Sequence, residues 1–148
     1  GAANRRALQR VLAAAEALGR PLSLLVVDAD DFKKINDRFG HAMGDVVLCE
    51  LVRTLQATVR EGDLVARTGG EEFVVVLPET RRADAVAIAE RICENVRQMA
   101  VPAPDGPVRP TVSVGCASGL PTSALLSAAD AALYEAKSCG RDRVRCAA

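Results

Sequence analysis

A short link that contains two adjacent glycines restricts the fold more than any other feature of this sequence. The flanking residues 63–67 and 72–77 are rich in valine, leucine and phenylalanine, which is typical of β-strands. The link itself, residues 68–71, contains Gly69 and Gly70. Strand, glycine-containing link and strand together predict a β-hairpin. At least part of the fold is therefore expected to be an antiparallel sheet.

The rest of the chain alternates between helix-like and strand-like segments. Apolar residues at three- and four-residue spacing predict helices, and these cover residues 4–18, 31–39, about 44–59, about 82–96 and about 122–139. Three further β-rich runs predict strands at residues 22–27, 111–117 and 143–146. Residues 101–110 hold four of the seven prolines and are expected to form a loop. This order predicts an α/β (α+β) domain with a central mixed, mainly antiparallel sheet flanked by helices.

Size and charge limit what such a domain can bind. The 148 residues fit one domain, residues 1–148, and the abrupt start suggests excision from a longer multidomain protein. The 19 basic residues offset 19 acidic ones, which argues against broad binding to nucleic acid or to an anionic membrane. No apolar run approaches the ~20 residues that cross a bilayer. We therefore expect a cytoplasmic domain without direct membrane contact, whose parent protein can still be membrane-anchored.

The cysteines give no sign of a structural cross-link or a metal site. There are five of them, an odd number, and none forms a C-x-x-C pair. Free, reduced thiols are expected, and neither a disulfide framework nor a zinc site is.

Acidic residues follow one predicted strand and also lie at the tip of the predicted hairpin. Asp28 and Asp30 come directly after residues 22–27, and Glu71 and Glu72 lie at the hairpin. If the two strands are neighbours, these carboxylates converge, which is costly unless a cation neutralises them. Hard oxygen ligands favour Mg²⁺ or Mn²⁺, and two such ions can hold a triphosphate and activate a hydroxyl.

A plainer interpretation of the same acids stays open. Asp28 and Asp30 could cap a helix that begins near Asp31, because aspartate is common at helix starts. The hairpin acids could be a solvated turn. The two glycines favour a ligand site, since glycine lets a backbone come close to a bulky ligand.

The motifs resemble those of a known family. Residues 67–73, R-T-G-G-E-E-F, are similar to the signature of the GGDEF family in its GGEEF variant. Residues 28–37, 40–45, 113–115 and 129–137 resemble further blocks of that family, in the same order. The resemblance implies a palm-like fold similar to nucleotidyl cyclases, and a diguanylate cyclase that condenses two GTP into cyclic di-GMP and pyrophosphate. Asp142 departs from the pattern, because the family often has Asn there.

The resemblance implies roles for the acidic residues. Asp28 and Glu71 correspond to metal ligands, with the carbonyl of Ala29 as a further ligand. The cofactor would be Mg²⁺ or Mn²⁺, two ions in each half-site. Glu71 is also the candidate that takes the proton from the attacking 3′-hydroxyl, and Glu72 supports the same cluster. The implied catalytic residues are therefore Glu71, Glu72 and Asp28.

The resemblance also implies a GTP site. Asn36 and Asp45 would read guanine, whose N1–H and 2-amino group a carboxylate can accept together. The sugar and phosphates would be contacted by Phe32, Lys33, Gly69, Gly70, Lys137 and Arg141. The alternative is that Asn36 and Asp45 only cap or turn the chain, and that the lysines and the arginine are ordinary surface cations.

A second ligand site is implied just before the hairpin. Arg60 and Asp63 form the R-x-x-D pattern that binds product and inhibits turnover in the family, and Arg91 resembles its second arginine. Arg60 could bond guanine O6 and N7 while Asp63 meets the donor edge. The alternative is a helix-terminal arginine and a strand-leading aspartate that bind nothing.

The implied reaction sets the expected partners. One GTP must attack the other, so two domains must face each other across a two-fold axis, and a homodimer is needed for turnover. One rival function is a catalytically idle receptor for cyclic di-GMP, and another is a structural module that only pairs sensor proteins. The intact hairpin acids and glycines favour the cyclase, and Asp45 disfavours ATP as substrate.

Overall fold

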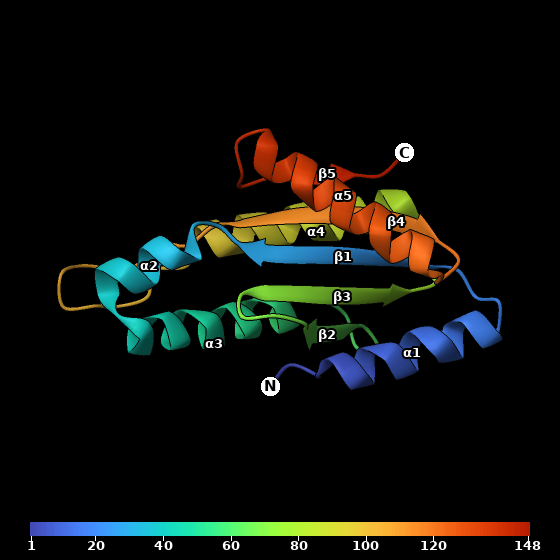
Figure 1. The fold of residues 1–148 in the computed structure, drawn as a ribbon, viewed down its shortest axis with the longest axis horizontal. Coiled ribbons are helices and arrows are strands. Elements are labelled where there is room, and N and C mark those ends of the chain that lie inside the picture. Colours follow the sequence, from blue (N-terminus) through green and yellow to red (C-terminus); the bar gives the residue numbers. More distant parts are fainter.

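The computed structural model describes all 148 residues and contains one five-stranded sheet (Figure 1). The strand order is β2-β3-β1-β4-β5. Neighbours are antiparallel except β4 and β5, which run parallel. The predicted mixed, mainly antiparallel sheet is therefore confirmed. The strands are β1 (Leu22–Ala29), β2 (Leu64–Arg67), β3 (Glu72–Pro78), β4 (Val112–Gly119) and β5 (Val144–Cys146).

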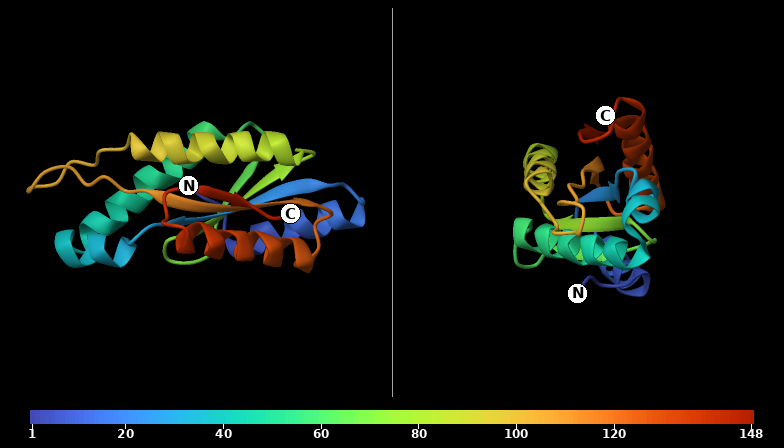
Figure 2. Two further views of the ribbon diagram at one scale, coloured as in Figure 1. Left: turned by 90° about the horizontal axis from the view of Figure 1, so that it is seen from above. Right: turned by 90° about the vertical axis from the view of Figure 1, so that its left-hand side faces the viewer.

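Five helices cover the sheet on both faces. They are α1 (Arg5–Ala17), α2 (Phe32–Phe39), α3 (His41–Thr58), α4 (Arg82–Arg97) and α5 (Ser123–Ser138). Helices α3 and α4 pack on one face and α1 and α5 on the other, as the views from above and from one end show (Figure 2). Helix α2 lies beyond the end of β1 that carries the acids (Figure 1). None of these helices is long and apolar enough to span a bilayer.

Alternation along β1 explains why this strand is a continuous apolar run. Leu25 and Val27 enter the core under α3 and α4, whereas Leu24 and Val26 enter the core under α1 and α5. Successive side chains of a strand point to opposite faces, so a strand covered on both sides must be apolar at every position. The central position of β1 thus follows from its composition.

The structure changes two predicted boundaries near the site and adds a backbone bridge inside one predicted loop. Strand β1 continues to Ala29, so Asp28 lies inside the strand and not after it. Helix α3 begins at His41 and not near Gly44, because Gly40, at φ 89°, ends α2 and starts α3 with no loop between them. Within the predicted loop 101–110, Val101 and Val108 exchange two backbone hydrogen bonds of 2.9 and 2.8 Å.

Helix α5 approaches β4 unusually closely at Gly115. A Cβ atom built on Gly115 would lie 2.8 Å from Leu133 Cα and even closer to the Ala129 carbonyl oxygen. These are backbone atoms of α5, so they cannot move aside without shifting the helix. Glycine is therefore needed here for close packing, which also sets how near α5 comes to the end of β1.

We predict that Gly115→Ala lowers the free energy of unfolding by at least about 2 kcal/mol, because the added methyl group overpacks the β4–α5 interface. Urea unfolding measures this change. Gly70→Ala is the matched control, because nothing lies within 4 Å of a Cβ at that position. Equal stability of the two variants would contradict the packing argument.

Candidate active site

The two acidic segments of the sequence meet at one end of the sheet. Strand β1 pairs with β3 so that Asp28 lies opposite Glu72. One residue further, the Ala29 N–H donates a 3.1 Å hydrogen bond to the Glu71 carbonyl oxygen. The hairpin tip is therefore fixed beside the end of β1, as the convergence of carboxylates requires.

Asp28 is the most constrained of these acids. Its side chain is only 16% exposed, and its Oδ2 lies 2.7 Å from the Lys137 ammonium of α5. Its Oδ1 is buried and accepts no hydrogen bond. A buried polar oxygen without a partner costs free energy, about 1–3 kcal/mol and more for a charged group. The site thus contains a carboxylate oxygen that can bind a cation or accept a hydrogen bond.

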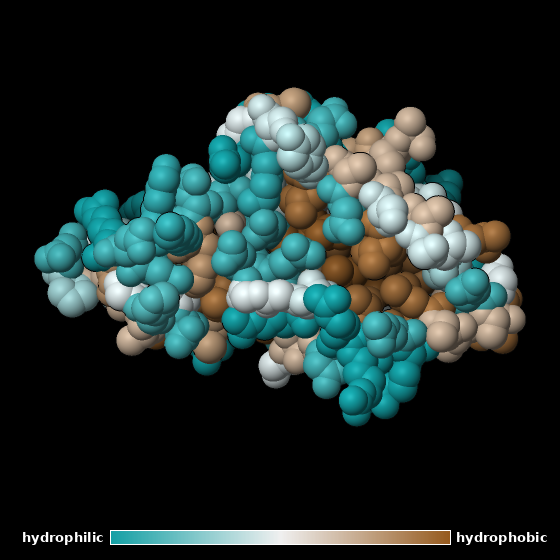
Figure 3. Space-filling view, viewed as in Figure 1, coloured by the Kyte–Doolittle hydropathy of each residue, from teal (hydrophilic) through white to brown (hydrophobic).

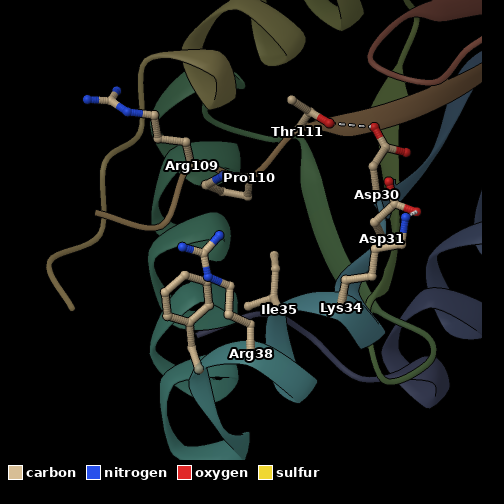
Figure 4. Close-up of a pocket in the computed structure, with 9 residues that line it drawn as sticks. Asp30, Asp31, Lys34, Ile35, Arg38, Arg109, Pro110 and Thr111 are labelled. Carbon is tan, nitrogen blue, oxygen red and sulfur yellow. Dashed lines mark hydrogen bonds and ion pairs between the residues drawn. The ribbon is translucent and has the colours of Figure 1, made fainter. Parts of the chain in front are cut away.

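Asp30 has a different environment, although it is only two residues away. It accepts hydrogen bonds from the Thr111 hydroxyl at 2.8 Å, the Ser113 hydroxyl at 2.7 Å and the Asp142 N–H at 3.0 Å (Figure 4 shows the first). Its side chain is almost fully buried. Asp30 therefore joins three segments of the fold and does not point its oxygens freely into the site. The only sequence signal for this role is the pair of hydroxyls two residues apart at the start of β4.

Glu72 lies among other carboxylates. Burial raises the pKa of Glu72, and Asp130 of α5 and then Asp28 raise it further. Burial also raises the pKa of Asp130. Asp130 belongs to this acidic cluster although the sequence assigned it no role. The sequence signal for this role is that Asp130 and Lys137, seven residues apart, share one face of α5.

An apolar hollow borders this acidic cluster. The space-filling view shows it between α5 and α1 (Figure 3). It has a volume of about 170 Å³, and Leu8, Leu12 and Leu126 line it together with Glu72 and Asp130. The hollow removes water from one side of the half-buried Glu72, which contributes to its raised pKa.

Hydrogen bonds from Arg67 fix the glycine-containing link of the hairpin. Arg67 donates hydrogen bonds to the carbonyl oxygens of Gly69, at 3.1 Å, and Gly70, at 2.6 Å. Neither glycine has a positive φ, so the turn itself does not require them. Nothing in the protein lies within 4 Å of a Cβ on Gly70. The glycines therefore leave free space beside the acids, which fits a closely bound ligand.

The start of α2 offers two free amides. Asp31, the residue before the helix, is in the left-handed region at φ 51° and makes no side-chain cap. No protein acceptor bonds the N–H groups of Phe32 and Lys33. Phe32 itself is buried in the core, whereas the Lys33 side chain is exposed. Free amides at a helix start suit an anion such as phosphate.

The predicted guanine-reading residues lie on adjacent helices. Asn36 of α2 lies directly against Gly44 of α3, where a Cβ would collide with its Oδ1. Asp45 follows Gly44 and lines a cavity of about 310 Å³ with Arg67, Phe73 and residues of α3. The structure thus brings Asn36 and Asp45 together beside the hairpin.

The two remaining predicted cations come from the end of α5. Lys137 pairs with Asp28, as described above, and Arg141 lies 3.8 Å from Asp31. Arg141 and Asp142 are both left-handed, at φ 64° and 47°. Aspartate adopts this conformation more readily than most residues, which explains how Asp142 replaces the asparagine of the family pattern.

A different basic hollow lies on the other side of α2. It measures about 240 Å³ and lies between α2 and the segment that enters β4 (Figure 4). Lys34, Arg38 and Arg109 supply its positive charge, and the Arg38 guanidinium lies 4.9 Å from the centre of the Phe39 ring. None of the residues assigned to GTP by sequence lines it, but Asp30 of the acidic segment does, so the hollow adjoins the acidic site.

The predicted product site is only partly assembled. Asp63 accepts hydrogen bonds from the Arg60 backbone and guanidinium, and Arg60 also contacts the Thr80 hydroxyl. Both residues line a cavity of about 330 Å³ between the turn that joins α3 to β2 and the end of β3. Arg91 is exposed on α4, and no hydrogen bond or ion pair joins it to Arg60 or Asp63.

The donors near Asp28 fit a divalent cation, although no group of three or more acidic, histidine or cysteine side chains is arranged as a finished metal site. Lys137 holds one Asp28 oxygen, and the other is buried without a partner. Glu72 begins the neighbouring strand β3, and Glu71 directly precedes it. This set of oxygens is the kind that Mg²⁺ and Mn²⁺ prefer.

Comparison with known proteins decides the family. Residues 1–143 match the family described as "Diguanylate cyclase, GGDEF domain". The chain belongs to the GGDEF family. This GGDEF domain is 46% identical over 131 residues to diguanylate cyclase DgcM of Escherichia coli, covering 86% of the chain and 31% of DgcM. The chain thus spans about a third of the length of that relative.

Solved structures agree with the assignment. The domain is similar to diguanylate cyclase SiaD of Pseudomonas aeruginosa, solved with its activator SiaC, at a TM-score of 0.92 and 39% identity over 97% of this chain and 58% of that one. It is also similar to the GGDEF domain of DgcB from Caulobacter crescentus, solved with c-di-GMP. That match has a TM-score of 0.89 and 32% identity, and covers 98% of this chain and 91% of the other.

We predict that Asp30→Ala lowers the free energy of unfolding by about 2–4 kcal/mol, because three donors then lose their buried acceptor. Asp37→Ala is the control, since Asp37 is exposed on α2 and is expected to change stability by no more than about 0.5 kcal/mol. Denaturant unfolding distinguishes the two. If Asp30→Ala is as stable as its control, Asp30 does not join the segments as described.

Proposed function

We propose that two copies of this domain condense two GTP into cyclic di-GMP, with release of pyrophosphate. One observation carries the proposal: a buried Asp28 oxygen without a partner lies beside the glycine-linked acids of the hairpin. A fold that only needed stability would pair or remove that carboxylate. The family membership and the cyclase names of its relatives support the same reaction.

The proposed cofactor is a pair of Mg²⁺ or Mn²⁺ ions in each half-site. Asp28, the Ala29 carbonyl and Glu71 would hold them. Bound there, the ions would neutralise phosphate charge and make a ribose hydroxyl more acidic. Lys137 already neutralises part of the Asp28 charge, at 2.7 Å, so the cluster can fold before a cation binds.

The substrate contacts are proposed from the placement of the side chains. Asp45 would accept hydrogen bonds from the N1–H and 2-amino group of guanine, and Asn36 would bond another ring edge. Adenine lacks that donor pair, so Asp45 would have no hydrogen-bond donors to accept from if ATP were bound. The free amides of Phe32 and Lys33 would bind phosphate oxygens, with Lys33, Lys137 and Arg141 supplying positive charge.

The proposed chemistry needs one proton acceptor in each domain. Glu71 would accept the proton of the 3′-hydroxyl, whose oxygen then attacks the α-phosphorus of the GTP in the facing domain. Glu72, with its raised pKa, lies beside Glu71 and would support the cluster. Gly69 and Gly70 would lie against the sugar and the α-phosphate, and nothing in the protein lies within 4 Å of a Cβ on Gly70. Because each domain supplies one nucleophile and one target, the active unit would be a two-fold homodimer.

We predict that Glu71→Gln lowers the rate of cyclic di-GMP formation by at least about 10²-fold, because an amide cannot accept the proton. The measurement is product formation from GTP and Mg²⁺ by a dimerised domain. Glu16→Gln, an exposed change on α1, is the control and should retain the rate. Full activity of Glu71→Gln would show that the proton goes elsewhere.

We further propose that cyclic di-GMP binds at Arg60 and Asp63 and inhibits turnover. The cavity between the α3–β2 turn and the end of β3 has room beside both residues, and the similar DgcB domain was solved with c-di-GMP. Arg60 would leave Asp63 and Thr80 to contact guanine O6 and N7. Arg91 of α4, which forms no hydrogen bond or ion pair with Arg60 or Asp63, would have to reach the bound ligand from its own helix. The same site would serve an idle receptor, which is the alternative if the domain binds product without turnover.

We predict that Arg60→Ala raises the concentration of cyclic di-GMP needed for half-inhibition by about tenfold or more, since a bidentate arginine–guanine contact contributes about 1–3 kcal/mol. Initial rates at increasing product concentration measure it. Arg53→Ala is the control, because Arg53 is exposed and pairs only with Glu50. An unchanged half-inhibitory concentration in Arg60→Ala would place the product elsewhere.

A further inference from the structure

Two of the five cysteines lie side by side on neighbouring strands. Cys116 of β4 and Cys146 of β5 are register partners in a parallel pair, and the Ala147 N–H bonds the Cys116 carbonyl oxygen at 2.8 Å. Register partners project from the same face, and adjacent strands are about 4.8 Å apart. Disulfides span Cα separations of about 4.4–6.8 Å. The backbone therefore places these thiols within reach of each other.

The surroundings of the two thiols are unequal. Cys116 is fully buried, and burial raises its pKa to about 12, with a further contribution from the neighbouring Cys146. Cys146 is partly exposed at the edge of the sheet. The Arg82 Nε of α4 donates a hydrogen bond to Cys146 Sγ at 3.2 Å. A guanidinium in that position stabilises negative charge on the sulfur when it reacts.

The other cysteines lack this arrangement and serve as internal comparisons. Cys49 and Cys139 are exposed, but no cation or second thiol contacts either sulfur. Cys93 is buried and donates only to the Val112 carbonyl oxygen, at 3.7 Å. Accessibility, a cationic neighbour and a second thiol occur together only at Cys146.

We propose that Cys146 and Cys116 form an oxidation site, at which a hydroperoxide converts the two thiols into a disulfide. The Cys146 sulfur attacks the peroxide, the O–O bond breaks, and a sulfenic acid forms while the peroxide is reduced to water or an alcohol. The Cys116 sulfur then attacks the Cys146 sulfur, the S–S bond forms, and water leaves with the Cys116 proton. Two electrons pass from the two sulfurs to the peroxide.

The register pairing of the two cysteines lets the buried Cys116 take part in the second step. A buried thiol reacts slowly with a reagent in solution, but here the attack is intramolecular and needs no diffusion. Strand β5 has only three residues and forms the edge of the sheet, so it can adjust to the length of an S–S bond. The site does not depend on cyclase activity.

The cross-link would close a loop that contains part of the candidate active site. Helix α5 and the turn after it lie between the two cysteines, and they carry Lys137 and Arg141. Tying β5 to β4 would hold both ends of this unit. Oxidation would therefore limit how far these two cations can move relative to Asp28.

The experiment treats the full chain with hydrogen peroxide in the absence of reductant, then alkylates free thiols and maps the peptides by mass spectrometry. We expect an intact mass lower by two hydrogens and a peptide that links Cys116 to Cys146, both reversed by dithiothreitol. Cys49 and Cys139 should be recovered in alkylated form, because their thiols stay free. A link that includes either of them, or sulfinic and sulfonic acid at Cys146 without a link, would overturn the proposal.

Variants test each participant. Cys146→Ser should abolish the link, and Cys116→Ala should leave a sulfenic acid at Cys146 that dimedone traps. Arg82→Met should slow disulfide formation several-fold, whereas Arg81→Met, which removes the neighbouring exposed arginine, should not. Equal rates for the two arginine variants would remove Arg82 from the site. If Cys116→Ala does not fold, the Cys146 and arginine variants still decide the question.

Discussion

The pairing of β1 with β3 is the constraint on which the rest of the candidate site depends. It places Asp28 opposite Glu72 and joins Ala29 to Glu71 by a backbone hydrogen bond. A slip of one residue would turn Asp28 to the other face of the sheet. The core prevents that slip, because both faces of both strands are buried and each register pair must match. The pairs that fix the register are Leu24–Val76, Leu25–Val75, Val26–Val74 and Val27–Phe73.

Asp28 and Asp30 are both largely buried, but the protein compensates their charges to different extents. Asp30 is surrounded by three donors, so its charge is compensated by the protein and contributes to the fold. Asp28 has one cation and one oxygen without a partner, so its charge is compensated only in part. Proteins commonly leave such local conflicts at functional sites and compensate for them elsewhere. Here the well-paired Asp30 stabilises the same strand end at which Asp28 stays available.

The unit formed by β4, α5 and β5 controls the positive side of the site. Gly115 lets the backbone of α5 lie against β4, and this contact determines where Lys137 meets Asp28. The turn after α5 is anchored by Asp142, whose N–H bonds Asp30 and whose carboxylate accepts from Arg97. The same unit ends in β5, where Cys146 meets Cys116. Lys137, Arg141 and the two cysteines therefore belong to one structural unit, although they lie at different places on it.

The sequence by itself determined the elements, the hairpin and the family, because periodicity, glycine links and motif order are local properties of a chain. It predicted the helices that carry Asn36 and Asp45 and the hairpin that carries the acids, although it ended β1 before Asp28 and started α3 after His41. Only the tertiary structure decided which side chains are partners. Asp30 bonds residues 111, 113 and 142, Glu72 is crowded by Asp130, and Cys116 meets Cys146. These contacts depend on the order of strands in the sheet, which the packing of the two apolar faces selects and no local pattern encodes.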